Sequence, residues 1–247
     1  DLAARFAVQW AEQPDAGYSR RTSAILERIR AGIPWRDAQH DIGRPSNGAA
    51  MRVAPIALFA AGAPHVARRL AERSALVTHR HPGAIAGAWA QTAAVLTALG
   101  HPTGAPIEVS GFIRSVCQAT EDASLEARIM TAGNLASRGD PVEIGETLGA
   151  GLMAEESVPA AICAFVAHPA SFVDAVSLAV RLGSDTDTVA SMTGALSGAL
   201  LGAGAIPERW LARIPEPARI HDLADALHAL AAARSTSPRH GDRPDER

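Results

Sequence analysis

The sequence has no lysine, few aromatic residues and only two cysteines, and each shortage narrows the classes of protein that it can encode. Aromatic residues make up 4% of the 247 residues. Because β-sandwiches use aromatic and β-branched residues in their strands, this scarcity favours closely packed, alanine-rich helices. All 23 basic residues are arginine, against 26 acidic residues, and the net charge of −3 comes without a long basic stripe. Nucleic acid is therefore not expected as the main partner.

Long apolar runs are also missing. No stretch reaches the roughly 18 residues that a bilayer crossing needs without a charge or a proline interrupting it, so we expect no membrane contact. Cys117 and Cys163 lie inside apolar segments and lack the spacing of a metal clip. Buried free thiols in a reducing compartment are favoured over a disulfide, so we expect a cytoplasmic protein.

The residues that are abundant favour a helical core. Apolar residues make up 47% of the chain and charged residues 20%, which is enough to bury a sizeable core. Apolar positions recur at helical spacing, and no stretch alternates with period two for long enough to predict a sheet. We therefore predict an all-α protein, with Pro159–Ala167 among its helices. Residues 234–247 are polar and read as a disordered tail.

One predicted helix, Val189–Leu201, carries an unusual glycine stripe. Gly194, Gly198 and Gly202 fall at four-residue intervals on one face. Each glycine costs a helix about 1 kcal/mol relative to alanine. Three on one face predict that another backbone packs very close, and that this helix lies at the centre of the domain.

The start of that helix holds a polar cluster. Asp185, Asp187 and Thr188 place two carboxylates and one hydroxyl within four residues. Such side chains cap helix N-termini, but capping needs only one of them. A second carboxylate in a poorly solvated place is costly unless a proton or a cation neutralises it, and all-oxygen donors fit Mg²⁺ or Mn²⁺. Multiple capping and metal binding both remain open, and the cluster supplies only part of a coordination sphere.

Two further features allow several interpretations. The polar, glycine-rich stretch 39–48 leads into the apolar run 49–61. A helix beginning there would offer N–H groups and a positive dipole end to an anion, although an ordinary interhelical loop is the simpler interpretation. His79 interrupts the helical pattern before Pro82. It could contact a ligand, bind a metal or be a satisfied histidine at a helix junction.

Several segments, taken in order, resemble the ADP-ribosylglycohydrolase family. Residues 183–195, Gly-Ser-Asp-Thr-Asp-Thr-Val-Ala-Ser-Met-Thr-Gly-Ala, resemble the metal-binding signature that opens a central helix in that family. Residues 46–55, Ser-Asn-Gly-Ala-Ala-Met-Arg-Val-Ala-Pro, resemble its substrate loop. Thr78-His79 resembles its Thr-His element, and residues 156–161 resemble the segment before its penultimate core helix. These blocks stand in family order, which makes the joint match specific.

The resemblance implies a fold and a function. The fold is an all-α, single-domain orthogonal multi-helix bundle of the ADP-ribosylglycohydrolase type, which we expect over residues 1–233. The function is metal-dependent hydrolysis of the glycosidic bond between ADP-ribose and an acceptor, at a binuclear Mg²⁺ or Mn²⁺ centre. ADP-ribose or an ADP-ribosylated protein is then the expected partner.

The resemblance also implies roles for particular residues. Asp185 and Asp187 would be catalytic metal ligands, and Thr188 would be a third ligand. The ADP-ribose pocket would be lined by Asn47, Gly48, Met51 and His79, with the loop N–H groups facing the diphosphate. Arg52 would either meet the substrate or hold the loop by an internal ion pair.

The chain departs from the family pattern in two ways. A Gly-Asp-Ala-x-Gly helix and an Asp-Asp-Thr segment, which supply the remaining metal ligands in the family, do not occur in the sequence, so we expect an N-terminal piece to be missing before Asp1. Ser184 and Ser46 stand where glycine is common in the family. The missing segments leave open a catalytically inactive ADP-ribose-binding or structural member of the fold. A remote alternative is a Mg²⁺-dependent terpenoid synthase-like enzyme, because such enzymes also hold Mg²⁺ and a diphosphate with helix-borne aspartates.

Overall fold

The computed structural model describes residues 1–102 and 105–236, and this part of the chain is built of helices, turns and loops without a named strand. The prediction of an all-α protein is confirmed. The elements, in chain order, are α1 (Leu2–Glu12), α2 (Arg20–Arg30), the 3-10 helix η1 (Asn47–Arg52), α3 (Ala54–Phe59), α4 (Pro64–Leu76), α5 (Pro82–Leu99), α6 (Val109–Ala119), α7 (Ala123–Ala136), α8 (Pro141–Leu148), α9 (Ala154–Ala167), α10 (Phe172–Arg181), α11 (Thr186–Leu201), the 3-10 helix η2 (Ala203–Ala205), α12 (Glu208–Leu211) and α13 (Pro217–Thr236).

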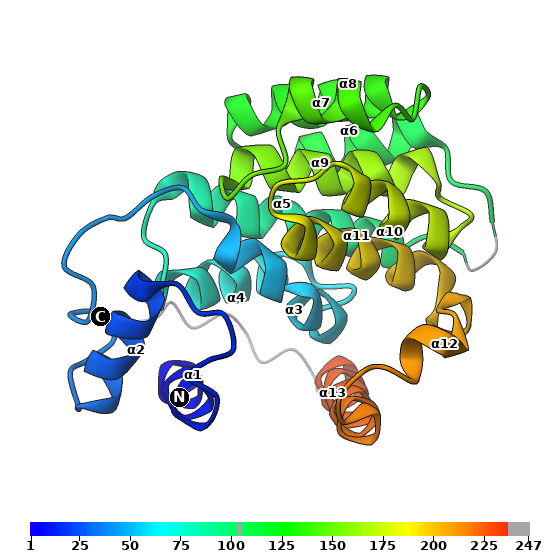
Figure 1. The fold of residues 1–247 in the computed structure, drawn as a ribbon. Helices are drawn as coiled ribbons and strands as arrows, with labels where there is room; N and C mark the ends of the chain where they lie inside the picture. Colours follow the sequence, from blue (N-terminus) through cyan, green and yellow to red (C-terminus); the bar gives the residue numbers. More distant parts are fainter. Residues whose placement is uncertain (103–104, 237–247) are drawn as a thin grey trace.

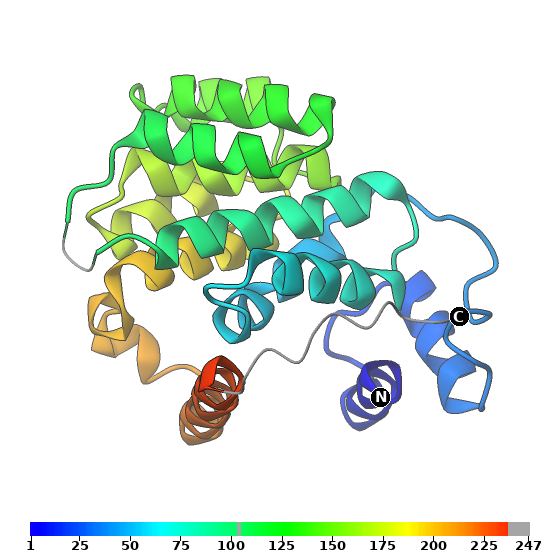
Figure 2. The ribbon, with the colours of Figure 1, turned by 180° about the vertical axis from the view of Figure 1, so that it is seen from behind.

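Two helices, α5 and α9, form the centre of the core. Both are apolar on nearly every side, as expected of helices buried all round, and they pack against each other and against α11 and η1. Helices α6, α7 and α8 cover one side of this centre, and α3 and α4 cover the other (Figures 1 and 2). Helices α5 and α9 approach each other closely at Gly87, where an added Cβ would lie 2.6 Å from the Cβ of Ala154.

Helix α9 begins at Ala154, so the start predicted at Pro159 is wrong. A proline inside a helix removes the hydrogen bond to the carbonyl four residues earlier, which here belongs to Glu155. Arg128 replaces that bond, because its Nε donates to the Glu155 carbonyl at 2.5 Å. The same guanidinium also donates to the Leu148 carbonyl at the end of α8. The helix can therefore extend toward its N-terminus past the proline.

The glycine stripe on α11 does not face another backbone, which corrects the expectation from the sequence. A Cβ added to Gly194 would come no closer than 3.7 Å to the Phe172 side chain, and one added to Gly198 would meet nothing within 4 Å. The helix is central for another reason: its larger side chains pack on α5, α9 and α10. The apolar side chains that it buries are Val189, Met192, Leu196 and Leu200.

The C-terminal helix lies at the edge of the molecule (Figure 1). Near its end, Arg234 donates to the carbonyls of Phe59 and Ala61 at 3.3 and 3.2 Å, which attaches α13 to α3. Because α13 continues to Thr236, the first residues of the expected polar tail are helical. The rest of that tail, 237–247, lies outside the described residues.

The expectation for the two cysteines is confirmed. Cys117 and Cys163 are both buried free thiols. In the described part of the chain, none of the helices combines the length and the apolar character that a bilayer crossing requires.

Candidate functional site

Backbone hydrogen bonds hold two loops and one helix start together. The loop before η1 pairs with the loop before α9, and that second loop pairs with the start of α11. The bonds are Ala154 N to Pro45 O at 2.8 Å, Asn47 N to Leu152 O at 2.9 Å, and Asp185 N to Ala150 O at 2.9 Å. The motif residues, far apart in sequence, therefore meet at one place.

Glu156 stabilises the middle loop. Its Oε2 accepts from the Gly151 N–H at 3.1 Å, and the side chain packs against Gly149, whose φ of +69° suits glycine. The segment that begins at Glu156 was singled out only by its resemblance. In the structure this glutamate shapes the loop on which the site is built.

The residues of η1 join the polar cluster on α11. Asn47 Nδ2 donates to Asp185 Oδ2 at 2.7 Å and more weakly to the Gly151 carbonyl at 3.3 Å. The Thr188 hydroxyl lies 3.8 Å from the Met51 sulfur, within reach of a weak hydrogen bond. Asn47 and Thr188 are 4% and 7% exposed, so water competes little for these contacts. Residues predicted for substrate and for metal thus lie side by side.

The two carboxylates of the cluster differ in environment. Asp185 is half-buried, whereas Asp187 is exposed, so only the first lies in the poorly solvated place that the sequence suggested for both. Asp185 occupies the N-cap position of α11, but its side chain makes no capping hydrogen bond, so the capping interpretation is wrong for this residue. Burial raises the pKa of the Asp185 carboxyl; the hydrogen bond from Asn47 opposes this and the neighbouring Asp187 adds to it.

These environments bear on whether the cluster suits a cation. Two carboxylates and a hydroxyl are donors that hard divalent ions prefer. A cation would offset both the burial that raises the pKa of Asp185 and the repulsion from Asp187 that adds to it. Across the described ranges, however, no group of three or more His, Cys, Asp or Glu side chains is placed to hold a metal. The donors present fit one side of a coordination sphere.

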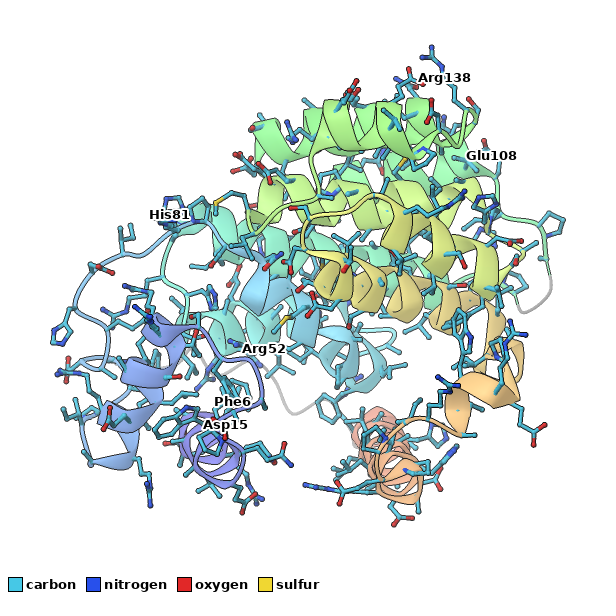
Figure 3. The ribbon with its side chains drawn as sticks, viewed as in Figure 1. Phe6, Asp15, Arg52, His81, Glu108 and Arg138 are labelled. Atoms are coloured by element: carbon cyan, nitrogen blue, oxygen red, sulfur yellow. The ribbon has the colours of Figure 1, made fainter. Side chains whose placement is uncertain are left out.

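Arg52, at the end of η1, points into the protein. Its Nη2 donates to the Ser74 carbonyl at 2.6 Å and to Thr78 Oγ1 at 2.9 Å, and its guanidinium lies 4.8 Å from the ring centre of Phe6 on α1 (Figure 3). Burial lowers the pKa of Arg52 to about 10, so it stays charged at neutral pH. Of the two roles considered, Arg52 holds the loop, but through a carbonyl and hydroxyl groups in place of the expected ion pair.

His79 contacts the same hydroxyl group as Arg52. Its Nδ1 is 2.7 Å from Thr78 Oγ1. Burial lowers the pKa of His79 to about 4, and the positive charges of Arg52 and Arg21 contribute, so the ring is neutral at neutral pH. A Cβ added to Gly48 would lie 2.9 Å from both Cε1 and Nε2 of the ring, so this position requires glycine.

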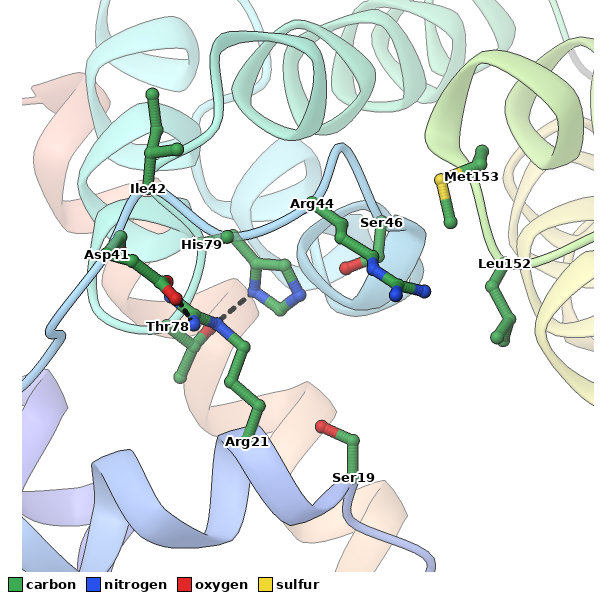
Figure 4. A pocket seen from close by; sticks show the side chains of 11 residues that line it. Ser19, Arg21, Asp41, Ile42, Arg44, Ser46, Thr78, His79, Leu152 and Met153 are labelled. Carbon is green, nitrogen blue, oxygen red and sulfur yellow. Dashed lines mark hydrogen bonds and ion pairs between the residues drawn. The ribbon is translucent and has the colours of Figure 1, made fainter.

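A cavity of about 520 Å³ opens beside His79 (Figure 4). Its lining residues are Ser19, Arg21, Asp41, Ile42, Gly43, Arg44, Ser46, Thr78, His79, Leu152 and Met153. Arg21 pairs with Asp41, donating to both its carboxylate and its carbonyl. Arg44 is exposed and has no ion-pair or hydrogen-bond partner among the described residues. The cavity therefore carries one uncompensated positive charge.

The sequence located the polar residues of this site better than its cavity. All seven predicted site residues lie on η1, beside it at His79, or at the start of α11. Seven of the eleven lining residues lie in the polar stretch 39–48 or in Thr78-His79, which the sequence singled out, but the other four were missed: Ser19, Arg21, Leu152 and Met153. Leu152 and Met153 gave no local signal, because they reach the cavity only through the pairing of two distant loops. The Asn47 N–H, expected to face a ligand, donates to the Leu152 carbonyl instead.

Comparisons with known proteins identify the family of this chain. A profile of the ADP-ribosylglycohydrolase family matches residues 1–237. ADP-ribosylhydrolase ARH3 of Mus musculus is 31% identical to this chain, over 93% of the chain and 70% of its own length. The Homo sapiens ARH3 is 30% identical, over 93% and 72%. A solved structure described as an ADP-ribosylglycohydrolase-related protein complex is 29% identical, with a TM-score of 0.70 over 93% of this chain and 73% of that one. The chain belongs to the ADP-ribosylglycohydrolase family.

Proposed function

We propose that this protein hydrolyses the glycosidic bond between ADP-ribose and an acceptor, and that the reaction depends on Mg²⁺ or Mn²⁺. Family membership supports a glycohydrolase activity in general. The observation that carries the finer proposal is the position of η1 between a carboxylate pair and a cavity: Asn47 bonds Asp185, and Gly48 lies against His79. A ligand held along η1 can contact both the carboxylate pair and the cavity.

The cavity suits the adenosine diphosphate part of such a ligand. Its volume of about 520 Å³ is within the range of small-molecule sites. The charge of Arg44 is uncompensated, whereas Arg21 is paired with Asp41, so the cavity favours an anion. His79 is neutral there and adds a polar ring without adding charge.

The cluster on α11 suits the reacting end of the ligand. Asp185, Asp187 and Thr188 would hold the cation, which supplies positive charge at the breaking bond and acidifies a bound water. Asn47 holds one carboxylate oxygen of Asp185 through the bond from Nδ2 at 2.7 Å, so the direction of that carboxylate is set before a ligand binds. The acceptor would be a protein side chain or another ADP-ribosyl conjugate.

The test is Asp187→Ala, with metal-dependent release of ADP-ribose from an ADP-ribosylated protein as the readout. We expect release to be lost. Asp174→Ala is the matched control, because Asp174 is also an exposed aspartate in the first turn of a helix, α10, and should leave release unchanged. Full release by Asp187→Ala would refute the proposal.

A second candidate is a protein of the same fold that binds ADP-ribose without cleaving it. The observation in its favour is that the two carboxylates have no third metal-ligating side chain beside them in the described part of the chain. Calorimetry with ADP-ribose, with and without Mg²⁺, separates the two candidates when combined with the release assay. Binding without metal-dependent release identifies the second.

The terpenoid synthase alternative loses its support. The cavity lining contains no phenylalanine, tyrosine or tryptophan, although such enzymes surround an apolar chain with aromatic side chains. Family membership points the same way.

A further inference from the structure

Three side chains form a hydrogen-bonded chain from the interior to the cavity. Arg52 Nη2 lies 2.9 Å from Thr78 Oγ1, and Thr78 Oγ1 lies 2.7 Å from His79 Nδ1. The Arg52 side chain extends inward from the end of η1 and is largely buried, Thr78 is 3% exposed, and His79 lines the cavity. In Figure 4 the edge of the His79 ring opposite Thr78 faces the Ser46 side of the cavity.

The chemistry of these groups decides where the protons lie. A guanidinium can only donate, so the Thr78 oxygen accepts from Arg52. The hydroxyl has one proton of its own, and the Nδ1 of His79 is its partner in the structure. If Nδ1 carried a proton instead, the Thr78 oxygen would accept twice and its own proton would have no acceptor among the described residues. A buried, unpaired hydroxyl is disfavoured, so Nδ1 accepts.

The remaining ring nitrogen therefore carries the proton. The ring is neutral at neutral pH because burial keeps its pKa near 4, and a neutral imidazole has one protonated nitrogen. Nε2 lies where a Cβ on Gly48 would come within 2.9 Å of it, at the foot of η1 and beside the cavity. This is the side from which a ligand would approach.

We propose that Arg52 is a positioning residue that acts through the Thr78 hydroxyl to hold His79 in its Nε2–H tautomer, so that the ring donates a hydrogen bond from Nε2 to a ligand oxygen in the cavity. The tautomer follows from the hydrogen-bonded chain alone. The donation to a phosphate or ribose oxygen of ADP-ribose rests on the proposed function. Arg52 thereby acts on the ligand without touching it.

The tautomer can be measured without any assay of activity. In ¹⁵N-labelled protein, two-bond ¹H–¹⁵N correlation spectra distinguish the two neutral tautomers of a histidine, and His79→Gln identifies the signals of His79. We expect the wild-type protein to show the Nε2–H pattern alone at neutral pH. The Nδ1–H pattern in the wild-type protein would overturn the proposal.

Variants test whether Arg52 acts on the His79 tautomer through the Thr78 hydroxyl. In both Thr78→Val and Arg52→Leu, the ¹⁵N chemical shifts of the two ring nitrogens of His79 should move toward their average, because each substitution frees the ring to exchange between its two tautomers. Thr78→Ser should restore the wild-type pattern. Thr92→Val is the matched control, because the Thr92 hydroxyl is equally buried but bonds only the Ala88 carbonyl of its own helix, at 2.7 Å. If Arg52→Leu does not fold, Thr78→Val still decides, and an unchanged pattern in Thr78→Val overturns the proposal.

Calorimetry with ADP-ribose tests the donor role. Thr78→Val should weaken binding by about fivefold, the worth of one neutral hydrogen bond, while Thr78→Ser and Thr92→Val stay near wild type. Equal affinity in Thr78→Val and wild type would overturn the donor role. If the wild-type protein does not bind ADP-ribose at all, the proposed function fails, whereas the tautomer measurement stands on its own result.

Discussion

Alanine at the two mid-helix glycines of α11 should stabilise the protein. An added Cβ at Gly198 meets nothing within 4 Å, and at Gly194 its nearest neighbour is Phe172 at 3.7 Å, an ordinary van der Waals distance. Neither glycine has a positive φ, so alanine fits both backbones without strain. Each substitution recovers about 1 kcal/mol of helix propensity, so the double variant should gain about 2 kcal/mol.

Gly87→Ala on α5 should have the opposite effect and serves as the control. Its Cβ would lie 2.6 Å from the Cβ of Ala154, so α5 and α9 must separate at this contact. Overpacking of this kind costs about 1–3 kcal/mol, which outweighs the gain in helix propensity. The same substitution, glycine to alanine within a helix, is thus expected to stabilise the protein on α11 and to destabilise it on α5.

Chemical denaturation followed by far-UV circular dichroism measures both effects. The Gly194→Ala/Gly198→Ala variant should unfold at higher denaturant with an unchanged slope, and its Tm should rise by about 4–8 °C. Gly87→Ala should unfold at lower denaturant. A lower midpoint for either single substitution on α11 would refute the reasoning, because it would show a close neighbour that the structure does not contain.

Three other substitutions test local features of the site and its support. Ser184→Gly should stabilise the protein by about 1 kcal/mol in the same denaturation assay, because Ser184 has a φ of 60°; a loss of stability would contradict this. His79 has a folded pKa of about 4 against an ordinary 6.5, so the unfolded state binds its proton first. As the pH falls from about 6.5 to about 4, up to about 3 kcal/mol of the free energy of unfolding should be lost, and His79→Gln should reduce this loss. An equal dependence of stability on pH in both proteins would contradict the prediction. Arg128→Ala should cost about 1–3 kcal/mol, and Pro159→Ala should recover part of that by returning an N–H to the Glu155 carbonyl, so strictly additive effects would disprove the compensation.

The features that follow from local patterns could be predicted from the sequence. Apolar spacing predicted the all-α class and the helix at Val189–Leu201, because a buried helical face depends on residues three and four apart. The site residues on η1 and at the start of α11 could also be located, because Asn47, Gly48, Asp185 and Asp187 lie within short motifs. Each such motif places its side chains on one short element.

The features that depend on residues far apart in the sequence could not be predicted from it. The start of α9 was misplaced because Arg128, far from Pro159 in sequence, supplies the missing hydrogen bond. The glycine stripe was misread because the cost of a glycine says nothing about which element faces it. The cavity was not predicted because its lining comes from distant parts of the chain, such as Arg21 on α2 and Leu152 in the loop before α9.

The position of Asn47 couples the two halves of the site. Its backbone N–H bonds the loop that lines the cavity, through Leu152, and its side chain bonds Asp185. A cation at Asp185 and a ligand in the cavity therefore act on the same six-residue segment, and each should bind more tightly in the presence of the other, by the same factor. Titrating ADP-ribose with and without Mg²⁺, and Mg²⁺ with and without ADP-ribose, measures the two factors. Asn47→Ala should bring both toward one, because it removes the side-chain bond through which the segment senses the cation.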